Sequence, residues 1–286
     1  MYDVVIIGSG PAGISASLYT LRANLKTLIV GSIEKSAMYK AHKIDNYYGF
    51  EEGISGGELL VSGKNQALRL GAEFLEDEVL SIGLDEVFRL KISNKEVLAK
   101  SVLLATGQVR KKADIKNLDE FEGKGVSYCT TCDGFFYRDL EVGVVGSGDF
   151  ALEEARTLLD FTDKVTIFTN GKDWNDKTCE FKVNTAKISN LLGDDFVSEI
   201  LFEDGSKQNI DGVFVAGESA SSADFANKMG IDFFDNAIKV DNNQQTNIKG
   251  LFAAGDCTGG FKQIATAVGQ GALAGKNMIS FIKSQG

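Results

Sequence analysis

Apolar residues gather in short continuous runs along the chain, and several of these runs end at glycine-rich turns. The run at residues 2–7 is followed at once by Gly-Ser-Gly-Pro-Ala-Gly at residues 8–13, and then by a helical pattern to about residue 23. Another apolar run covers residues 26–30. Continuous apolar runs of this length are typical of parallel strands that are buried on both faces. We therefore predict a β-α-β unit with the glycine turn after its first strand.

The same succession of features recurs near the middle of the chain. A strand is predicted at residues 142–145, followed by the turn Gly-Ser-Gly-Asp-Phe-Ala at residues 146–151. A helix is then predicted over residues 152–159 and a second strand over residues 165–168. Two β-α-β units of this kind indicate two related dinucleotide-binding domains.

Two further apolar runs complete the pattern, at residues 102–107 and 251–256, and a helix is predicted from about residue 263 to residue 283. The late run has the character of another strand of the first domain. We therefore predict an α/β fold with two dinucleotide-binding (Rossmann-like) domains, the second inserted into the first. The predicted boundaries are 1–110 and 236–286 for the first domain, which is discontinuous, and 111–235 for the inserted domain.

The first glycine turn carries the features of a nucleotide-binding site. In a G-x-G-x-x-G turn the first glycine allows a tight turn and the second lets the backbone approach a pyrophosphate. The third allows close packing of helix on strand, and the helix N-terminus attracts the phosphates. Gly8, Gly10 and Gly13 occupy these positions between a strand and a helix.

The acidic residue that usually ends the second strand and holds the ribose is missing. Val30 is followed by Gly31 and Ser32, and Glu34 is the nearest acid. Either backbone groups at Gly31 or the Glu34 side chain would have to take over that contact.

Gly255 and Asp256 follow the late strand, at the edge where ligands of parallel sheets bind. The next helix begins near Lys262, so its N-terminal dipole can stabilise negative charge on a bound cofactor. Asp256 can equally be a helix-capping or turn residue.

Composition narrows the range of functions. A net charge of −10 argues against nucleic acid and against a polybasic membrane contact. No apolar run approaches the roughly 18 residues of a membrane helix. The residues before the first apolar run lack the basic region of a signal peptide. We therefore expect a cytoplasmic protein.

Four cysteines occur, and only Cys129 and Cys132 are closely spaced. A Cys-x-x-Cys pair opens and closes readily as a disulfide. The alternative is half of a zinc site, but only His42, Cys179 and Cys257 remain as nitrogen or sulfur ligands. No metal site is predicted.

Asp133 directly follows the cysteine pair. Reduction of a disulfide requires an acid for the departing thiolate, and Asp133 is the best local candidate if burial raises its pKa. The alternative for Asp133 is a helix N-cap.

Together these features resemble the low-molecular-weight thioredoxin reductase family, over nearly the whole chain. The matching runs are residues 8–13, Ile-Asp-Asn-Tyr-Tyr-Gly-Phe at 44–50, Ala-Thr-Gly at 105–107, Gly-Val-Ser-Tyr-Cys-Thr-Thr-Cys-Asp-Gly at 125–134, and Gly-Leu-Phe-Ala-Ala-Gly-Asp at 250–256.

The resemblance implies an FAD cofactor, a homodimer and thioredoxin as the electron acceptor. Cys132 would face the flavin, Cys129 would attack the thioredoxin disulfide, and Asp133 would act as the acid. The implied cofactor-binding residues are Gly8, Ser9, Gly10, Pro11, Ala12, Gly13, Gly31, Asn46, Val79, Ala105, Thr106, Gly107, Asp256, Lys262, Gln263, Ile264 and Ala265.

Three departures from the NADPH-dependent members concern the second domain. The strand at 165–168 ends in Thr169-Asn170 without the arginine cluster that holds the NADPH 2′-phosphate. Too few residues precede the next predicted strands, at 181–183 and 188–192, for the usual helix. Phe150 stands in the second glycine turn, where it is expected to crowd the pyrophosphate path.

These departures resemble the ferredoxin-dependent flavin thioredoxin reductases. We therefore predict that reduced ferredoxin supplies electrons through FAD and the cysteine pair to thioredoxin. The alternatives are an NADPH-dependent thioredoxin reductase with an atypical nucleotide pocket, and a non-catalytic redox-sensing flavoprotein. Because the chain and ferredoxins are both acidic, local positive charge would steer docking, unless these clusters are only solvated surface. The candidate clusters are Arg110, Lys111, Lys112 and Lys116; Lys35, Lys40, His42 and Lys43; and Lys262.

Overall fold

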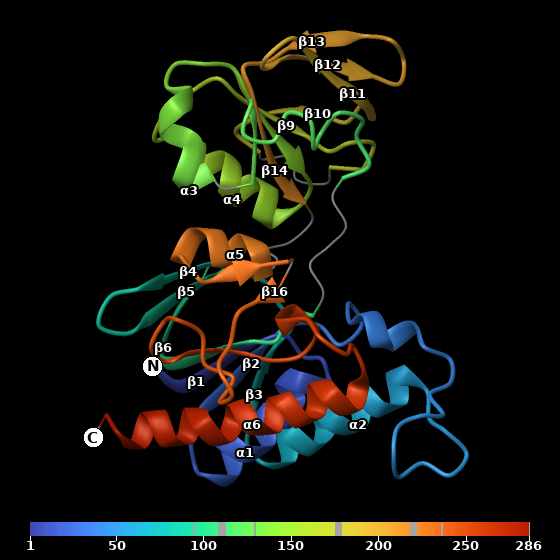
Figure 1. Cartoon of the computed structure of the whole chain (residues 1–286), viewed down its shortest axis with the longest axis vertical. Coiled ribbons are helices and arrows are strands. Elements are labelled where there is room, and N and C mark those ends of the chain that lie inside the picture. The colour runs from blue at the N-terminus through green and yellow to red at the C-terminus, as the bar shows by residue number, and fades with distance from the viewer. Residues whose placement is uncertain are drawn as a thin grey trace. The chain divides into compact units, whose positions relative to one another are not determined.

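The computed structural model describes residues 1–93, 95–107, 113–128, 130–174, 179–217, 222–235 and 237–285. The chain divides into two compact units: residues 1–110 with 221–286, and residues 111–220. Each contains a sheet with a parallel core and helices packed against it (Figure 1), as predicted for an α/β fold with two Rossmann-like domains.

The first unit is built on a seven-stranded sheet, in which the order β3-β2-β1-β6-β5-β4 is completed by β17 beside β6. β6 pairs with three strands: its first half pairs antiparallel with β5, and its second half lies between β1 and β17, parallel to both. The strands are β1 (Tyr2–Ile7), β2 (Thr27–Val30), β3 (Glu73–Leu75), β4 (Val79–Leu84), β5 (Phe88–Ile92), β6 (Lys95–Leu104) and β17 (Leu251–Ala253).

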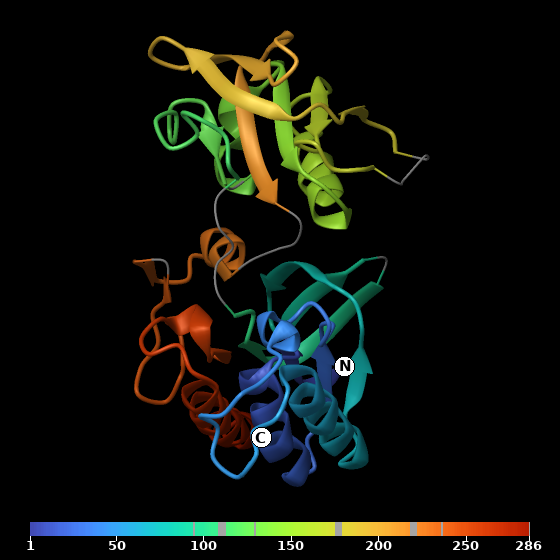
Figure 2. The ribbon, with the colours of Figure 1, turned by 90° about the vertical axis from the view of Figure 1, so that its right-hand side faces the viewer.

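Three helices cover one face of this sheet: α1 (Pro11–Arg22), α2 (Gly56–Arg69) and α6 (Ile264–Lys283). Both views show them side by side (Figures 1 and 2), and α1 contacts α2 and α6. Their apolar residues and those of β1, β2, β6 and β17 form one buried cluster. Shorter elements of this unit are η1 (Ala37–Lys40), α5 (Ser222–Met229), β15 (Phe233–Phe234), β16 (Ala237–Ile238) and η3 (Asp256–Thr258).

The second unit has a five-stranded parallel sheet in the order β10-β9-β8-β14-β7. Helix α4 packs against β8, β9 and β14, and an antiparallel sheet of β11, β12 and β13 shares a buried core with the parallel strands. The elements are β7 (Val126–Ser127), α3 (Thr130–Asp133), η2 (Gly134–Tyr137), β8 (Val142–Gly146), α4 (Asp149–Leu158), β9 (Val165–Phe168), β10 (Lys182–Asn184), β11 (Ile188–Gly193), β12 (Val197–Phe202), β13 (Lys207–Asn209) and β14 (Gly212–Gly217).

The connection from β9 to β10 is short, as the sequence predicts. β10 lies parallel and directly next to β9. The described residues between them, 169–174 and 179–181, form no helix. Parallel neighbours usually need a crossover helix, so this unit is a shortened version of the usual dinucleotide-binding fold.

The predicted return to the first domain at residue 236 is too late, because the chain returns at residue 221. Helix α5 contacts β4 and β16, both elements of the first unit. Phe225 and Ala226 on α5 are buried, each with 1% of its surface exposed. The return falls in the run Gly-Glu-Ser-Ala-Ser-Ser at residues 217–222, but only tertiary contacts assign α5 to the first unit.

Among the described residues, no helix has both the length and the apolar character needed to cross a membrane.

The contact between α1 and α6 provides a test of the packing. A Cβ added at Gly271 would lie 2.1 Å from the carbonyl oxygen of Ala12, whereas one added at Gly269, on the same helix, meets nothing within 4 Å. We expect Gly271→Ala to lower the free energy of unfolding by about 1–3 kcal/mol, because the helices must move apart. Gly269→Ala should raise it by roughly 0.5–1 kcal/mol through its lower backbone entropy. Thermal unfolding followed by circular dichroism compares the two, and equal effects would contradict the packing.

Candidate active site

The glycine turn after β1 is shaped by backbone contacts that exclude side chains. Gly8 has a φ of 113°, and a Cβ there would lie 2.1 Å from the carbonyl oxygen of Ala105. A Cβ on Gly13 would lie 2.0 Å from the carbonyl oxygen of Gly8. A Cβ on Gly10 would meet only Ser36 Oγ, at 3.9 Å. Gly8 and Gly13 therefore fold the turn, while the space at Gly10 remains open for a ligand.

The start of α1 faces the same open space. Gly10 is its N-cap and provides no side chain to accept from the first N–H groups, and Pro11 begins the helix. Unsatisfied N–H groups and the positive end of the helix dipole form an anion site. Ser9 and Ala12 are buried beside this turn.

The predicted residues of the neighbouring strands meet at the same edge of the sheet. β1, β2, β6 and β17 run parallel, so their carboxyl ends lie together. These ends bring Gly31, the segment Ala105–Gly107 and Gly255 close to the glycine turn. A Cβ on Gly31 would lie 3.2 Å from Ser9 N, and one on Gly255 would lie 3.0 Å from Ala12 Cβ.

One backbone group of Gly31, a candidate for the ribose contact, already has a partner. The Gly31 N–H already donates to the Leu75 carbonyl at 2.9 Å. Glu34 is exposed, in the segment just after β2. Lys35 forms a salt bridge with Glu78 at 2.6 Å, which connects this segment to the start of β4. The next residue, Val79, is buried.

A hydrogen bond joins two distant predicted residues on the other side of the edge. Asn46 Nδ2 donates to Gln263 Oε1 at 3.0 Å. Gln263 is the N-cap of α6, but its side chain makes no capping bond and binds Asn46 instead. Ile264 begins the helix and Ala265 follows it, with Lys262 exposed just before.

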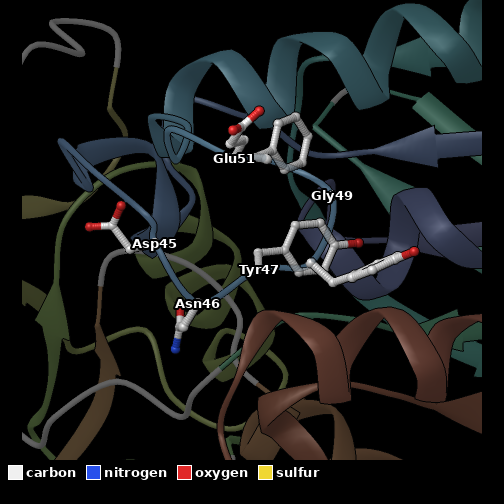
Figure 3. Close-up of a pocket in the computed structure, with 7 residues that line it drawn as sticks. Asp45, Asn46, Tyr47, Gly49 and Glu51 are labelled. Atoms are coloured by element: carbon white, nitrogen blue, oxygen red, sulfur yellow. The ribbon is translucent and has the colours of Figure 1, made fainter.

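The loop that contains Asn46 is rich in exposed aromatic side chains. Residues 45–51 line a hollow of about 610 Å³ (Figure 3). The Tyr47 and Phe50 rings stack with centroids 6.1 Å apart, and Tyr48 is 97% exposed. Lys43 pairs with Asp45 at 2.8 Å, so the positive charge of Lys43 is partly balanced.

Asp256 and Cys257 are adjacent in the chain but differ in burial: Asp256 is partly exposed and Cys257 is buried. Gly255 is the N-cap of η3, and no side chain caps it, so Asp256 does not have the predicted capping role. Cys257 is fully buried, and burial raises the pKa of its thiol to about 12. Because the thiolate is the reactive form, Cys257 is a packing residue.

The cysteine pair belongs to the second unit. Cys129 and the side chain of Cys132 lie outside the described part of the chain, and the backbone of Cys132 belongs to α3. Asp133 is the last residue of α3, and its Oδ2 accepts a 2.6 Å hydrogen bond from Ser127 Oγ on β7. It also precedes η2, but makes no side-chain capping bond there, so the N-cap alternative is wrong.

The surroundings of this turn contain groups that the sequence did not single out. Thr130 Oγ1 donates to the buried carboxyl of Glu154, at 2.6 Å. Burial and the charge of Asp133 raise the pKa of Tyr137. Phe135 and Phe136 are 58% and 72% exposed, directly after the redox turn. The sequence shows two adjacent aromatic residues just after the cysteine pair, and this could have indicated an interaction surface there.

Comparison with known proteins identifies the family. The model of the pyridine nucleotide-disulphide oxidoreductase family matches residues 2–271. The thioredoxin reductase of Peptoclostridium acidaminophilum is 34% identical, over 99% of this chain and 98% of its own length. The chain belongs to the thioredoxin reductase family. It is an FAD-containing disulfide reductase.

Solved structures of similar proteins add detail. The atypical thioredoxin reductase TRi from Desulfovibrio vulgaris Hildenborough is 44% identical, with a TM-score of 0.95 over 100% of this chain and 99% of that one. A ferredoxin-flavin thioredoxin reductase from Clostridium acetobutylicum is 32% identical, with a TM-score of 0.76 over 99% and 98%.

In this chain the second glycine turn differs chemically from the first. Gly148, with a φ of 83°, is the N-cap of α4, and Asp149 is its exposed first residue. Phe150 is 1% exposed. The prediction that Phe150 crowds the pyrophosphate path is therefore wrong, because its side chain is used in packing. The exposed group at this helix end is the Asp149 carboxyl.

The end of β9 also differs from a nucleotide pocket. Thr169 is buried, and its hydroxyl donates to the Lys172 carbonyl. Asn170 Oδ1 accepts from the Ile188 N–H at 2.9 Å. Both side chains thus support the short path to β10 and β11.

The open space at Gly10 predicts a selective loss of FAD. We expect Gly10→Val to weaken FAD binding by roughly ten- to hundredfold, because overpacking of about 1–3 kcal/mol would arise only with the pyrophosphate bound. Gly83→Val is the matched control, since that position on β4 is also open. Flavin absorbance of the purified proteins measures FAD content, and far-ultraviolet circular dichroism checks the fold. Full FAD content in Gly10→Val would place the pyrophosphate elsewhere.

Proposed function

We propose that this thioredoxin reductase receives its electrons from reduced ferredoxin rather than from NADPH. Electrons would pass through FAD and the Cys129–Cys132 pair to thioredoxin. The observation that carries the proposal is the exposed Asp149 at the start of α4, where a nicotinamide dinucleotide would place its pyrophosphate.

Electrostatics at the start of α4 opposes a dinucleotide. A helix N-terminus favours anions because its N–H groups and dipole are positive. At α4 that position already carries a carboxyl, as an acidic residue in the first turn. A pyrophosphate there would meet a like charge, whereas the first turn of α1 carries no acidic residue.

The end of β9 lacks the groups that recognise a 2′-phosphate. Each charge-assisted bond from an arginine to phosphate contributes about 1.5–3 kcal/mol. Residues 169–174 contain no arginine, and Thr169 and Asn170 use their side chains within the protein. The TM-score of 0.76 to a ferredoxin-flavin thioredoxin reductase further supports the proposal.

FAD suits such a donor, since a flavin can take up single electrons and pass on a pair. The residues that would hold it are those at the carboxyl edge of the first sheet: the turn at 8–13, Gly31, the segment at 105–107, Asp256, and Asn46 with Gln263. The start of α1 would neutralise the pyrophosphate, and the start of α6 would stabilise negative charge on the reduced ring.

The cysteine pair then performs thiol–disulfide exchange. We propose that the Cys129 thiolate attacks one sulfur of the thioredoxin disulfide, forming a mixed disulfide and releasing the other thioredoxin sulfur as a thiolate. Cys132 next attacks the Cys129 sulfur, which re-forms the Cys129–Cys132 disulfide and releases thioredoxin as a dithiol. Two electrons leave the enzyme in one turn of this cycle. Asp133, hydrogen-bonded to Ser127, would supply and collect the proton.

Two exposed surfaces suit the two protein partners. Phe135 and Phe136 are exposed apolar groups immediately after the redox turn, and we propose that thioredoxin docks on them. For ferredoxin, exposed Lys262, beside the FAD edge, and the exposed residues Lys40, His42 and Lys43 remain the candidate contacts. The candidate cluster at Arg110, Lys111 and Lys112 lies outside the described residues. A cytoplasmic homodimer is part of the proposal.

Anaerobic reduction separates the two electron donors. Because α4 and β9 oppose a dinucleotide, we expect excess NADPH or NADH to leave the flavin absorbance unchanged over minutes. Reduced ferredoxin should bleach it and, with thioredoxin present, generate free thiols. Bleaching by NADPH within seconds would establish the NADPH-dependent alternative. Bleaching by ferredoxin without thioredoxin reduction would favour a flavoprotein that only senses redox state.

The cysteine assignment has its own test. We expect Cys129→Ser to lower the rate of thioredoxin reduction by at least about a thousandfold, since the variant lacks the attacking thiolate. Cys179→Ser is the matched control, because Cys179 is a partly buried free cysteine outside the redox turn. Thiol release is measured with reduced ferredoxin as the electron source. Unchanged activity in Cys129→Ser would assign the attack to another thiol.

A further inference from the structure

A buried carboxyl group lies against the redox turn and has no part in the exchange steps above. Glu154, on α4, is 3% exposed. Its Oε2 accepts a hydrogen bond of 2.6 Å from Oγ1 of Thr130, which is 1% exposed. Thr130 is the first residue of α3 and is bonded directly to Cys129. Glutamate is rarely buried to this extent unless it is paired.

Packing alone gives no reason to keep this polar pair. Well-packed apolar side chains of similar volume often stabilise a core as much as a buried polar pair, or more. Removing only one partner of a buried hydrogen bond, in contrast, is costly. A buried bond between the redox turn and α4 therefore restricts the turn to one position at some expense of stability.

Two hydrogen bonds between side chains hold the redox turn from different directions. Ser127 on β7 binds Asp133 at 2.6 Å, which closes the turn across its ends. Thr130 binds Glu154, which ties the middle of the turn to α4. The residues that carry the two sulfurs lie between these fixed points. Exchange requires the attacking and leaving sulfurs to be aligned, and small displacements of reacting groups cost large factors in rate.

We infer that Glu154, acting through Thr130, is a positioning residue for thiol–disulfide exchange. The Thr130–Glu154 bond keeps the Cys129–Cys132 turn in the orientation from which Cys129 attacks and Cys132 resolves the mixed disulfide. The inference rests on the output half of the proposed function, the transfer from the cysteine pair to thioredoxin. It is independent of the electron donor.

The test follows the exchange step without any electron donor. The FAD-loaded protein is reduced with dithiothreitol, freed of reagent anaerobically, and mixed with increasing concentrations of an oxidised bacterial thioredoxin. The change in thioredoxin fluorescence gives the limiting rate and the half-saturating concentration separately. The variants are Thr130→Val, which removes the hydroxyl, Thr130→Ser, which keeps it, and Glu154→Gln, which keeps an oxygen acceptor without the carboxyl.

We expect Thr130→Val to lower the limiting rate about tenfold or more, with the half-saturating concentration unchanged. Thr130→Ser should restore the rate to within about twofold, and Glu154→Gln should lie between the two because neutral hydrogen bonds are weaker. The double variant Thr130→Val with Glu154→Gln should be no slower than Thr130→Val alone, since both changes remove the same interaction.

Two control variants carry the same chemical changes on α4. Thr157→Val removes a hydroxyl that binds the backbone of its own helix, and Glu153→Gln changes the carboxyl next to Glu154. Both should exchange at the wild-type rate. Thermal unfolding of every variant shows whether a slow rate merely reflects lost structure. If Thr130→Val does not fold, the ratio of Glu154→Gln to Glu153→Gln decides the question.

Three results would overturn the inference: a wild-type rate in Thr130→Val, failure of Thr130→Ser to restore the rate, or a change only in the half-saturating concentration. Failure of the proposed function gives a different result, in which the wild-type protein itself does not reduce thioredoxin. The small disulfide 5,5′-dithiobis(2-nitrobenzoate) then replaces thioredoxin in the same series. The Thr130→Val deficit must persist with it if the bond positions the thiols.

Discussion

Gly8, Gly13 and Gly271 each place bare backbone where a Cβ would lie 2.0–2.1 Å from a carbonyl oxygen. At Gly8 the glycine turn contacts the residue after β6. At Gly13 the start of α1 packs against the turn, and at Gly271 α6 packs against α1. The chain returns for the last contact after the whole second unit. The arrangement at the carboxyl edge of the first sheet, where we propose that FAD binds, depends on backbone surfaces that only glycine provides.

The second unit repeats this framework with different chemistry at its helix end. Gly148 again allows a tight turn before a helix, but the first turn of α4 presents Asp149, and Phe150 is turned into the core. The route from β9 to β10 is short, and Thr169 and Asn170 support it with their side chains. Under the proposed function, a fold that commonly binds a dinucleotide would serve here chiefly as a support for the redox turn.

Rigidity at that turn comes from polar contacts in a buried setting. The Ser127–Asp133 bond spans the cysteine pair, and the bond from Thr130 to Glu154 starts between the two cysteines. Cys257, which lies outside the pair, illustrates the contrast, because burial raises the pKa of its thiol to about 12 and leaves it unreactive. The position of a cysteine in the fold, more than its presence, therefore decides whether it takes part in redox chemistry.

The sequence by itself determined the two β-α-β units and the glycine turns. It also determined that the described residues between β9 and β10, 169–174 and 179–181, form no helix. These features follow from apolar periodicity and from residues that permit a local conformation. It also indicated the family through the run around Cys129 and Cys132.

Boundaries and side-chain partners were decided only by tertiary structure. Residue 221 replaces 236 because α5 is held by β4 and β16. Phe150 turns inward because a large apolar side chain gains more from burial than from an exposed turn. Glu154 reaches Thr130, and Asn46 reaches Gln263, across separations that local sequence patterns do not encode. Hydrogen bonds between distant residues depend on how complete elements pack, and that packing is a property of the whole chain.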